Sequence, residues 1–291
     1  MNLASKITSR SIYRTEYAPQ ASRSITLPRF LQQNGSTWLL VLPGILLVGL
    51  FAVPLLALTV RAINADFLDY VLSTQALSAL RLSLMTSLTT VLLTILMGTP
   101  LAYVLARWEF PGKATLELLI DLPIVLPPSV AGVALLIAFG RNGLFGPLLR
   151  SVDISLPFTV AAVVIAQLFV AAPLYVRAAR IGFAEIDIQI EEAARVEGAN
   201  QWQIFCHVMF PLARRALLSG AILTWTRALG EFGATMLFAG NLEGVTQTMP
   251  MAIYLGFERN LGIAIALSTV LIGFSVFLLS ITRRLEQKNV H

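Results

Sequence analysis

The sequence predicts an all-α protein, a polytopic membrane bundle of about six transmembrane helices with a structured cytoplasmic loop. Of its 291 residues, 56% are hydrophobic and only 13% are charged, and the mean hydropathy is +0.76. Soluble domains carry about 25% charged residues, so most of this surface is expected to face lipid. The apolar stretches lack the alternation with a period of two residues that transmembrane strands show, which leaves helices as the spanning elements.

Six apolar stretches are each long enough to cross the hydrocarbon core, which takes about 20 helical residues. In chain order they are residues 38–60, 80–106, 116–140, 157–178, 216–239 and 261–281. Their even spread predicts one continuous transmembrane domain over residues 38–284. Residues 1–37 are expected to precede this domain as a basic tail, and residues 285–291 to follow it as a short cytoplasmic end.

The third predicted span is the one most interrupted by proline. It contains Pro123, Pro127 and Pro128 in the sequence DLPIVLPP. Each proline lacks a backbone donor and tends to kink a helix. Two interpretations remain open: ordinary kinking of a membrane helix, or a kinked segment that borders a water-filled path.

Basic residues predict the orientation. With the N-terminus placed in the cytoplasm, fifteen of the 21 Lys and Arg residues fall in cytoplasmic segments and five in external ones, and Arg227 lies within a span. The positive-inside rule therefore favours cytoplasmic locations for both termini. The same rule accounts for the basic residues of the 1–37 tail, although its Ser-rich, acid-poor composition is also that of an organellar transit peptide.

The sequence offers little for catalysis, metal binding or nucleic acid. Cys206 is the only cysteine, and the two histidines, His207 and His291, are far apart. Metal sites need clustered donors, and enzyme sites need a constellation of titratable groups. The basic residues lie between apolar segments and form no patch with interleaved aromatics. We therefore expect no metal, no cofactor, no enzymatic activity and no nucleic-acid partner for this chain.

The connection at residues 185–213 is the longest cytoplasmic loop and has its own internal structure. Residues 186–196 are strong helix formers, and residues 202–208 can form a second helical turn before Pro211. Gly198 lies between the two segments and favours a tight elbow. The mixture of acidic and apolar residues in this loop suits docking of a soluble partner.

The spacing of residues in this loop resembles the EAA loop of bacterial ATP-binding-cassette importer permeases. The positions that carry the resemblance are Glu192, Ala193, Ala194, Gly198, Val208, Phe210 and Pro211. Val208 and Phe210 depart conservatively from the Ile-x-Leu-Pro ending of the family pattern. The resemblance implies a coupling helix that enters a cleft of an ATPase subunit, with Glu192 bonding to that partner and the two alanines allowing close approach.

The same resemblance implies two ATPase subunits and a second copy of this chain. The pattern G-x-x-x-x-G-K-[ST] that binds nucleotide phosphates is absent from the sequence, so ATP and Mg²⁺ are expected on the partner ATPase.

The fifth predicted span contains charged residues at a depth where each costs on the order of 3 kcal/mol. Arg227 and Glu231 are four residues apart and can pair along one helix face. On one helix, Thr224, Arg227, Glu231 and Thr235 would fall within an arc of about 80°. This polar stripe is either a structural salt bridge between helices or part of the lining or gate of an anion path.

Residues 227–235, with the sequence RALGEFGAT, resemble the molybdate and tungstate permeases, as do residues 238–241 and 246–250. Sulfate/thiosulfate permeases share the Gly-Glu-aromatic-Gly core. The resemblance covers about residues 38–284 and implies import of a tetrahedral oxyanion, with molybdate or tungstate favoured, across a bacterial inner membrane.

An external binding protein would deliver the anion to the outer loops at 61–79, 141–156 and 241–260. Sulfate import is the nearest alternative. A self-sufficient ion-coupled carrier is the alternative from another class, with Asp121 and Glu231 as its only acids near membrane depth.

Overall fold

The computed structural model describes residues 37–63 and 66–287. The chain forms two compact units, with their boundary between Pro54 and Leu55. Nearly all of the predicted 1–37 tail, and the last four residues of the predicted C-terminal segment, lie outside the described residues.

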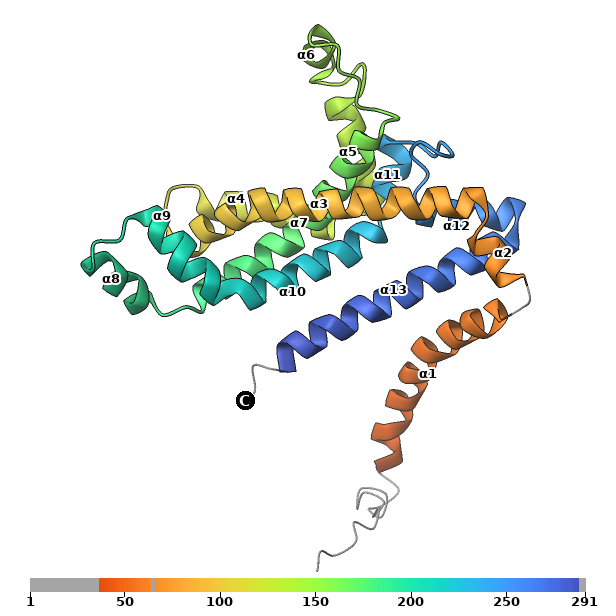
Figure 1. The fold of residues 1–291 in the computed structure, drawn as a ribbon, viewed down its shortest axis with the longest axis horizontal. Helices are drawn as coiled ribbons and strands as arrows, with labels where there is room; N and C mark the ends of the chain where they lie inside the picture. The colour runs from red at the N-terminus through yellow and green to blue at the C-terminus, as the bar shows by residue number, and fades with distance from the viewer. Residues whose placement is uncertain (1–36, 64–65, 288–291) are drawn as a thin grey trace, which may run out of the picture. The chain divides into compact units, whose positions relative to one another are not determined.

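Every regular element in the described residues is helical, in agreement with the predicted all-α fold (Figure 1). The elements are, in order, α1 (Thr37–Ala62), α2 (Phe67–Val71), α3 (Thr74–Arg107), α4 (Lys113–Val125), α5 (Pro128–Phe139), α6 (Gly146–Ser151), α7 (Val160–Ala184), α8 (Ile188–Val196), α9 (Gln201–Ile204), the π-helical turn η2 (Phe205–Met209), α10 (Phe210–Leu229), α11 (Gly233–Phe238), α12 (Met249–Arg259) and α13 (Leu261–Gln287).

Four helices in the described residues are long and apolar enough to cross a membrane. They lie at Val41–Ala62, Thr74–Arg107, Val160–Ala184 and Leu261–Arg284, and the bent pair α4 and α5 gives a fifth span if it is counted as one. By these criteria the described residues hold four or five spans, and the two predicted spans that do not appear as single long helices are 116–140 and 216–239. The other four predicted spans each correspond to one of these helices.

The predicted span at 116–140 is broken rather than straight. Helices α4 and α5 meet at a bend of 119°, and Leu126 between them is extended, with ψ 136°. A residue before proline is pushed out of the helical region, and Pro127 and Pro128 cannot donate to the preceding turn. The prolines therefore end α4, and Pro128 starts α5 in the first helical turn, where no donor is needed.

The predicted span at 216–239 is also not one helix. Helix α10 ends at Leu229 and α11 begins at Gly233. Arg214, Arg215 and Arg227 lie within α10, and charged residues of this kind reduce its suitability as a membrane span.

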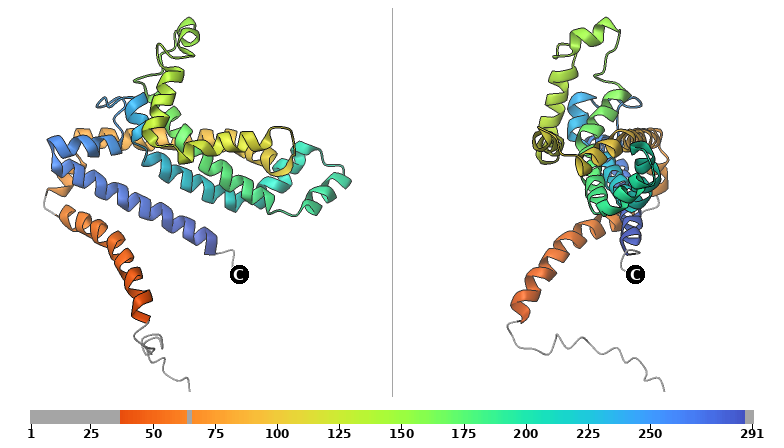
Figure 2. Two further views of the ribbon diagram at one scale, coloured as in Figure 1. Left: turned by 180° about the vertical axis from the view of Figure 1, so that it is seen from behind. Right: turned by 90° about the vertical axis from the view of Figure 1, so that its left-hand side faces the viewer.

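Helices α3, α7 and α10 pack side by side as the core of the second unit (Figures 1 and 2). Their contacts use small and hydroxyl-bearing residues, which allow close approach and hydrogen bonds between membrane helices. The buried Gln167 of α7 accepts a hydrogen bond from Thr90 of α3 at 2.9 Å, and its amide donates to Thr86 at 3.3 Å. These bonds fix the register of α3 against α7.

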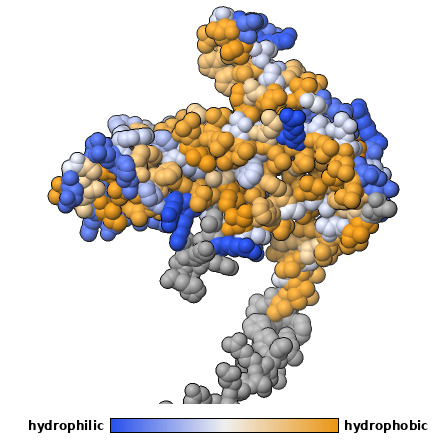
Figure 3. Space-filling model, viewed as in Figure 1, coloured by the Kyte–Doolittle hydropathy of each residue, from blue (hydrophilic) through white to orange (hydrophobic). Residues whose placement is uncertain are grey.

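Helix α3 has 34 residues and is therefore about 51 Å long. A bilayer core is only about 30 Å thick, so α3 is long enough to extend past it. In the space-filling view, apolar side chains cover much of the surface over the helices, and hydrophilic residues are frequent at the end where α8 lies, along the opposite edge and at the top (Figure 3). This distribution fits a lipid-facing bundle with polar connections at its ends.

Candidate functional site

The loop predicted as a coupling element forms two short helices joined by an elbow. Helix α8 is capped by Asp187, whose carboxylate accepts from the Gln189 N–H at 2.9 Å. Gly198 has φ +88°, the left-handed conformation that glycine adopts without a steric penalty. Asn200 and Gln203 then form a reciprocal capping box at the start of α9. The predicted two-helix loop with a glycine elbow is confirmed as a structure.

Gly198 divides the loop into a first arm, which contains α8, and a second arm, which contains α9 and η2. The second arm is longer than the sequence predicts. Helix α9 continues through η2 directly into α10, so no break occurs before Pro211. The Phe210 N–H bonds to the Phe205 carbonyl, five residues back. Pro211 lies in the first turn of α10. The second arm is therefore mechanically continuous with a helix of the core.

The outer face of this loop, residues 185–213, here called the elbow loop, is exposed. Glu192 and Ala193 are exposed and Ala194 is half-buried. Large apolar side chains lie exposed on both arms, including Val196 at 87% and Trp202 at 70%. Clustered exposed apolar residues commonly mark a protein contact.

Glu191, beside Glu192, is a residue that the family pattern does not single out. Its side chain is only 3% exposed. It lies 2.7 Å from Arg195 Nη2 within α8 and 3.4 Å from Arg107 Nε at the end of α3. The resemblance to the EAA loop points to Glu192 instead. The contact of Glu191 with Arg195 could have been predicted from the sequence, because the two residues are four apart on one helix.

The predicted pair in the fifth span is present. Arg227 Nη1 lies 2.8 Å from Glu231 Oε2, and Glu231 is 1% exposed. The other oxygen, Oε1, accepts the Ala234 N–H at 2.8 Å at the start of α11. Oε2 is buried and has no donor in hydrogen-bond geometry among the described residues. Glu231 therefore joins the end of α10 to the start of α11.

The four residues of the predicted polar stripe do not share one helix. Thr224 is in α10 and Thr235 in α11, and Glu231 lies in the break between them. Thr224 is fully buried, with its hydroxyl 3.4 Å from the Ala171 carbonyl of α7. Thr235 is also fully buried, and its hydroxyl has no hydrogen-bond partner within the described part of the chain. The single-helix arc was wrong because the helix ends at Leu229; a role in the anion path stays a prediction.

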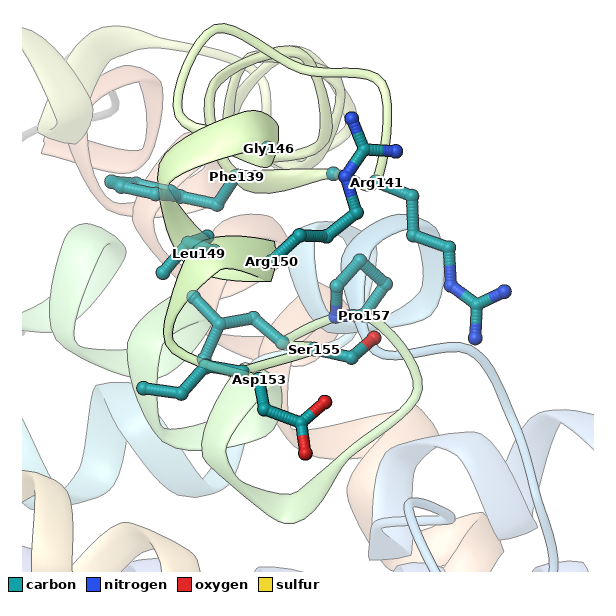
Figure 4. Close-up of a pocket in the computed structure, with 11 residues that line it drawn as sticks. Phe139, Arg141, Gly146, Leu149, Arg150, Asp153, Ser155 and Pro157 are labelled. Atoms are coloured by element: carbon teal, nitrogen blue, oxygen red, sulfur yellow. The ribbon is translucent and has the colours of Figure 1, made fainter.

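The segment from α5 to α7, which includes the predicted outer loop at 141–156, contains a cavity of about 320 Å³. Arg141, Arg150 and Asp153 are among the residues that line it (Figure 4). The guanidinium groups of Arg141 and Arg150 point away from the Asp153 carboxylate in this view. Exposed guanidinium groups favour contact with an acidic surface.

Residues 95–290 match the family model described as "Binding-protein-dependent transport system inner membrane component". The chain belongs to this family of ATP-binding-cassette permeases. The matched region includes the end of α3, the elbow loop and the Arg227–Glu231 pair. The description is that of a membrane component of a transport system, in agreement with the resemblance stated for the loop.

Among its relatives, the molybdenum transport system permease protein ModB of Mycobacterium tuberculosis is 40% identical over 231 residues, which are 79% of this chain and 88% of ModB. The sulfate transport system permease protein CysW of Synechococcus elongatus is 39% identical over 213 residues, 72% of this chain and 74% of CysW.

Among solved structures, a bacterial alginate ABC transporter in complex with an alginate pentasaccharide-bound periplasmic protein has a chain that matches with a TM-score of 0.65 at 18% identity. The match covers 88% of this chain and 96% of that one. At this identity the likeness shows the fold alone.

Proposed function

We propose that this permease imports molybdate, or the closely similar tungstate, driven by ATP hydrolysis on partner subunits. The observation that carries the proposal is the match to ModB over 88% of that protein's length. The resemblance of residues 227–235 and 246–250 to molybdate permeases points the same way. Sulfate is the second candidate, because CysW is similar at nearly the same identity.

The proposed assembly contains two copies of this chain, two ATPase subunits and an extracytoplasmic binding protein, with both termini in the cytoplasm. Each chain offers one elbow loop for one ATPase. The family description names a binding-protein-dependent system, which supports the external partner. The exposed arginines Arg141 and Arg150 supply a basic surface that favours an acidic face on that protein.

In this scheme the pore itself needs only weak contacts with the anion, because tight binding would prevent release. Selection then rests on the binding protein. Arg227, one third exposed beside a buried Glu231, is the intramembrane cation proposed to border the anion path. Thr224 and Thr235 are both fully buried. We therefore propose that they lie behind the residues that line the path and do not contact the anion.

The test is uptake into proteoliposomes that contain the permease, its ATPase and its binding protein. We expect accumulation of radiolabelled molybdate that depends on ATP and is inhibited by tungstate more than by sulfate. Sulfate uptake without molybdate uptake would assign the chain to sulfate instead. Uptake that persists without the ATPase would identify an ion-coupled carrier, and the proposal would then be wrong.

A further inference from the structure

The elbow loop is covalently joined to only two of the three core helices. Helix α7 leads into it at Ala184, and α10 leaves it at Phe210. Helix α3 packs against both of these helices but enters the loop by no covalent route. Any movement of the loop can therefore reach α3 only through helix packing and through side-chain contacts between the loop and the end of α3.

Those side-chain contacts converge on the last two turns of α3. Glu191 of α8 is buried, and its Oε1 accepts a hydrogen bond from the Tyr103 hydroxyl at 3.2 Å. Its Oε2 faces Arg107 Nε at 3.4 Å. The Arg107 Nη2 also donates to the Ile186 carbonyl at 2.6 Å, at the entry to the loop. Tyr103 and Arg107 thus hold the first arm at two separate points.

Tyr103 holds the second arm as well. Its hydroxyl accepts a hydrogen bond from Gln201 Nε2 of α9 at 2.7 Å while it donates to Glu191. Its ring packs against Phe183 at the end of α7 and Phe205 of η2, with centroid distances of 5.5 and 5.1 Å. One side chain of α3 therefore contacts both arms on either side of the Gly198 elbow.

We propose that Glu191 is a positioning residue that fixes the elbow loop to α3 through Tyr103 and Arg107. When a partner displaces the loop, α3 then moves with α7 and α10 as one body. The physical reason is the cost of separation: the buried carboxylate of Glu191 would lose the Tyr103 hydroxyl and the Arg107 guanidinium and keep only Arg195 of its own helix, which is destabilising. This inference rests on the proposed function, because it takes an ATPase to be the partner that displaces the loop.

The neighbouring carboxylates of Glu191 and Glu192 have different roles in this arrangement. Glu192 is exposed on the outer face of α8 and is available to the partner, whereas Glu191 is buried against α3. Consecutive helix residues are about 100° apart around the axis, so the two side chains serve different surfaces. Loss of Glu192 should weaken binding of the ATPase. Loss of Glu191 should leave this binding intact and reduce the amount of oxyanion transported per ATP hydrolysed.

The experiment compares Glu191→Gln and Tyr103→Phe with the control Glu109→Gln in proteoliposomes that contain the complete transporter. Glu109 is an exposed carboxylate just past the end of α3 that pairs with Lys113 at 2.7 Å, and such a surface pair contributes little. Tyr103→Phe keeps the ring and all the charges, so it tests the tether without leaving a buried ion unpaired. Two quantities are measured: ATPase retained on the permease, and oxyanion transported per ATP hydrolysed.

We expect both tether variants to retain the ATPase and its ATP hydrolysis, and to transport at least about fivefold less oxyanion per ATP, since each removes a hydrogen bond to a charged group. Hydrogen exchange over residues 186–204 should also accelerate, and Glu109→Gln should match wild type. An unchanged transport-to-ATP ratio in both tether variants would overturn the proposal. Absence of ATP-driven uptake in the wild type would instead refute the proposed function itself.

Discussion

The backbone conformation at Gly198 is enough to explain why this residue is a glycine. A Cβ added there would meet no atom within 4 Å, so substitution causes no clash. The φ of +88° is nevertheless unfavourable for other residues, by about 1–2 kcal/mol, and most unfavourable for β-branched ones. The elbow between α8 and α9 therefore depends on glycine through strain rather than through packing.

This strain gives the first prediction. Gly198→Val should reshape the loop, weaken ATPase binding and reduce oxyanion uptake, while expression and dimerisation stay near normal. Gly198→Asn should behave much better, because asparagine tolerates the left-handed region. Co-purification of the ATPase and substrate-stimulated ATP hydrolysis measure the effect. Pro211→Ala should do less, because Pro211 lies in a first helical turn.

Gly112 supplies a matched control for this prediction. It has φ +87° and open space around its Cβ position, but lies at the start of α4 outside the elbow loop. Gly112→Val should therefore impose a similar backbone strain without loss of ATPase binding. Equal losses in both variants, or full ATPase binding by Gly198→Val, would mean that the elbow is not the coupling element.

The second prediction concerns Arg227 and Glu231. Glu231 is 1% exposed and Arg227 is one third exposed, so Arg227→Ala leaves a buried charge without its partner. Such losses cost several kcal/mol in full burial, and less here because Arg227 is partly solvated. We expect Arg227→Ala to lower the yield of folded protein more than Glu231→Gln does.

The double variant should recover much of the yield lost in Arg227→Ala, because the glutamine oxygen can still accept the Ala234 N–H. Size-exclusion chromatography of detergent extracts measures folded yield. Additive losses in the double-mutant cycle would count against direct pairing. Transport by the recovered double variant would also separate a structural pair from a residue needed for the anion path.

At the scale of whole helices, apolar length predicts the spans that form continuous helices, which are α1, α3, α7 and α13. It fails where a helix is broken and its halves pack separately. The prolines at 127 and 128 are visible in the sequence, but the sequence does not say whether they kink the helix or turn it by 119°. That outcome depends on the contact between α5 and α11, which lie far apart in sequence.

In the candidate site, too, the sequence predicts the local features but not the contacts between residues far apart in the chain. The pairing of Arg227 with Glu231 and the glycine elbow follow from local spacing, and the structure contains both. The contact of Glu191 with Tyr103 joins residues 88 positions apart, so local spacing cannot reveal it. Glu191 and Glu192 are also identical in type, and only packing against α3 distinguishes the buried carboxylate from the exposed one.

The α5–α11 contact carries the third prediction. A Cβ added to Gly132 of α5 would lie 2.9 Å from the Ala234 carbonyl oxygen and 2.9 Å from Leu237 Cβ. Because one of these is a backbone atom, the neighbour cannot simply rotate away. Gly132→Ala should therefore destabilise the permease by about 1–3 kcal/mol, the usual cost of overpacking. Thermal unfolding of the purified protein measures the loss.

Gly273 of α13 is the comparison for this prediction, since a Cβ there meets nothing within 4 Å. Gly273→Ala should be neutral or slightly stabilising, because alanine is the better helix former. If Gly132→Ala were as stable as Gly273→Ala, the close approach of α5 to α11 would not be required for the fold.

At the scale of the molecule, much apolar surface is left for lipid or for another chain. Large exposed side chains on the core include Leu96 and Met97 of α3, at 71% and 68% exposure. Exposed apolar side chains of this kind are unfavourable in water. The bilayer covers part of it, and a second copy of the chain is proposed to cover another part.

The last prediction is the stoichiometry. One chain carries one elbow loop, and the importer resemblance implies two ATPase subunits that act as a pair around ATP. A two-fold symmetric pair of identical chains presents two equivalent loops and closes without further subunits. Native mass spectrometry of the detergent-purified transporter should therefore find two permease chains, 2 × 31.7 = 63.4 kDa, with two ATPase subunits. A single permease chain with one ATPase would refute the symmetric arrangement. A complex purified from the native host that pairs this chain with a different permease chain would also refute it, because the two loops would then not be equivalent.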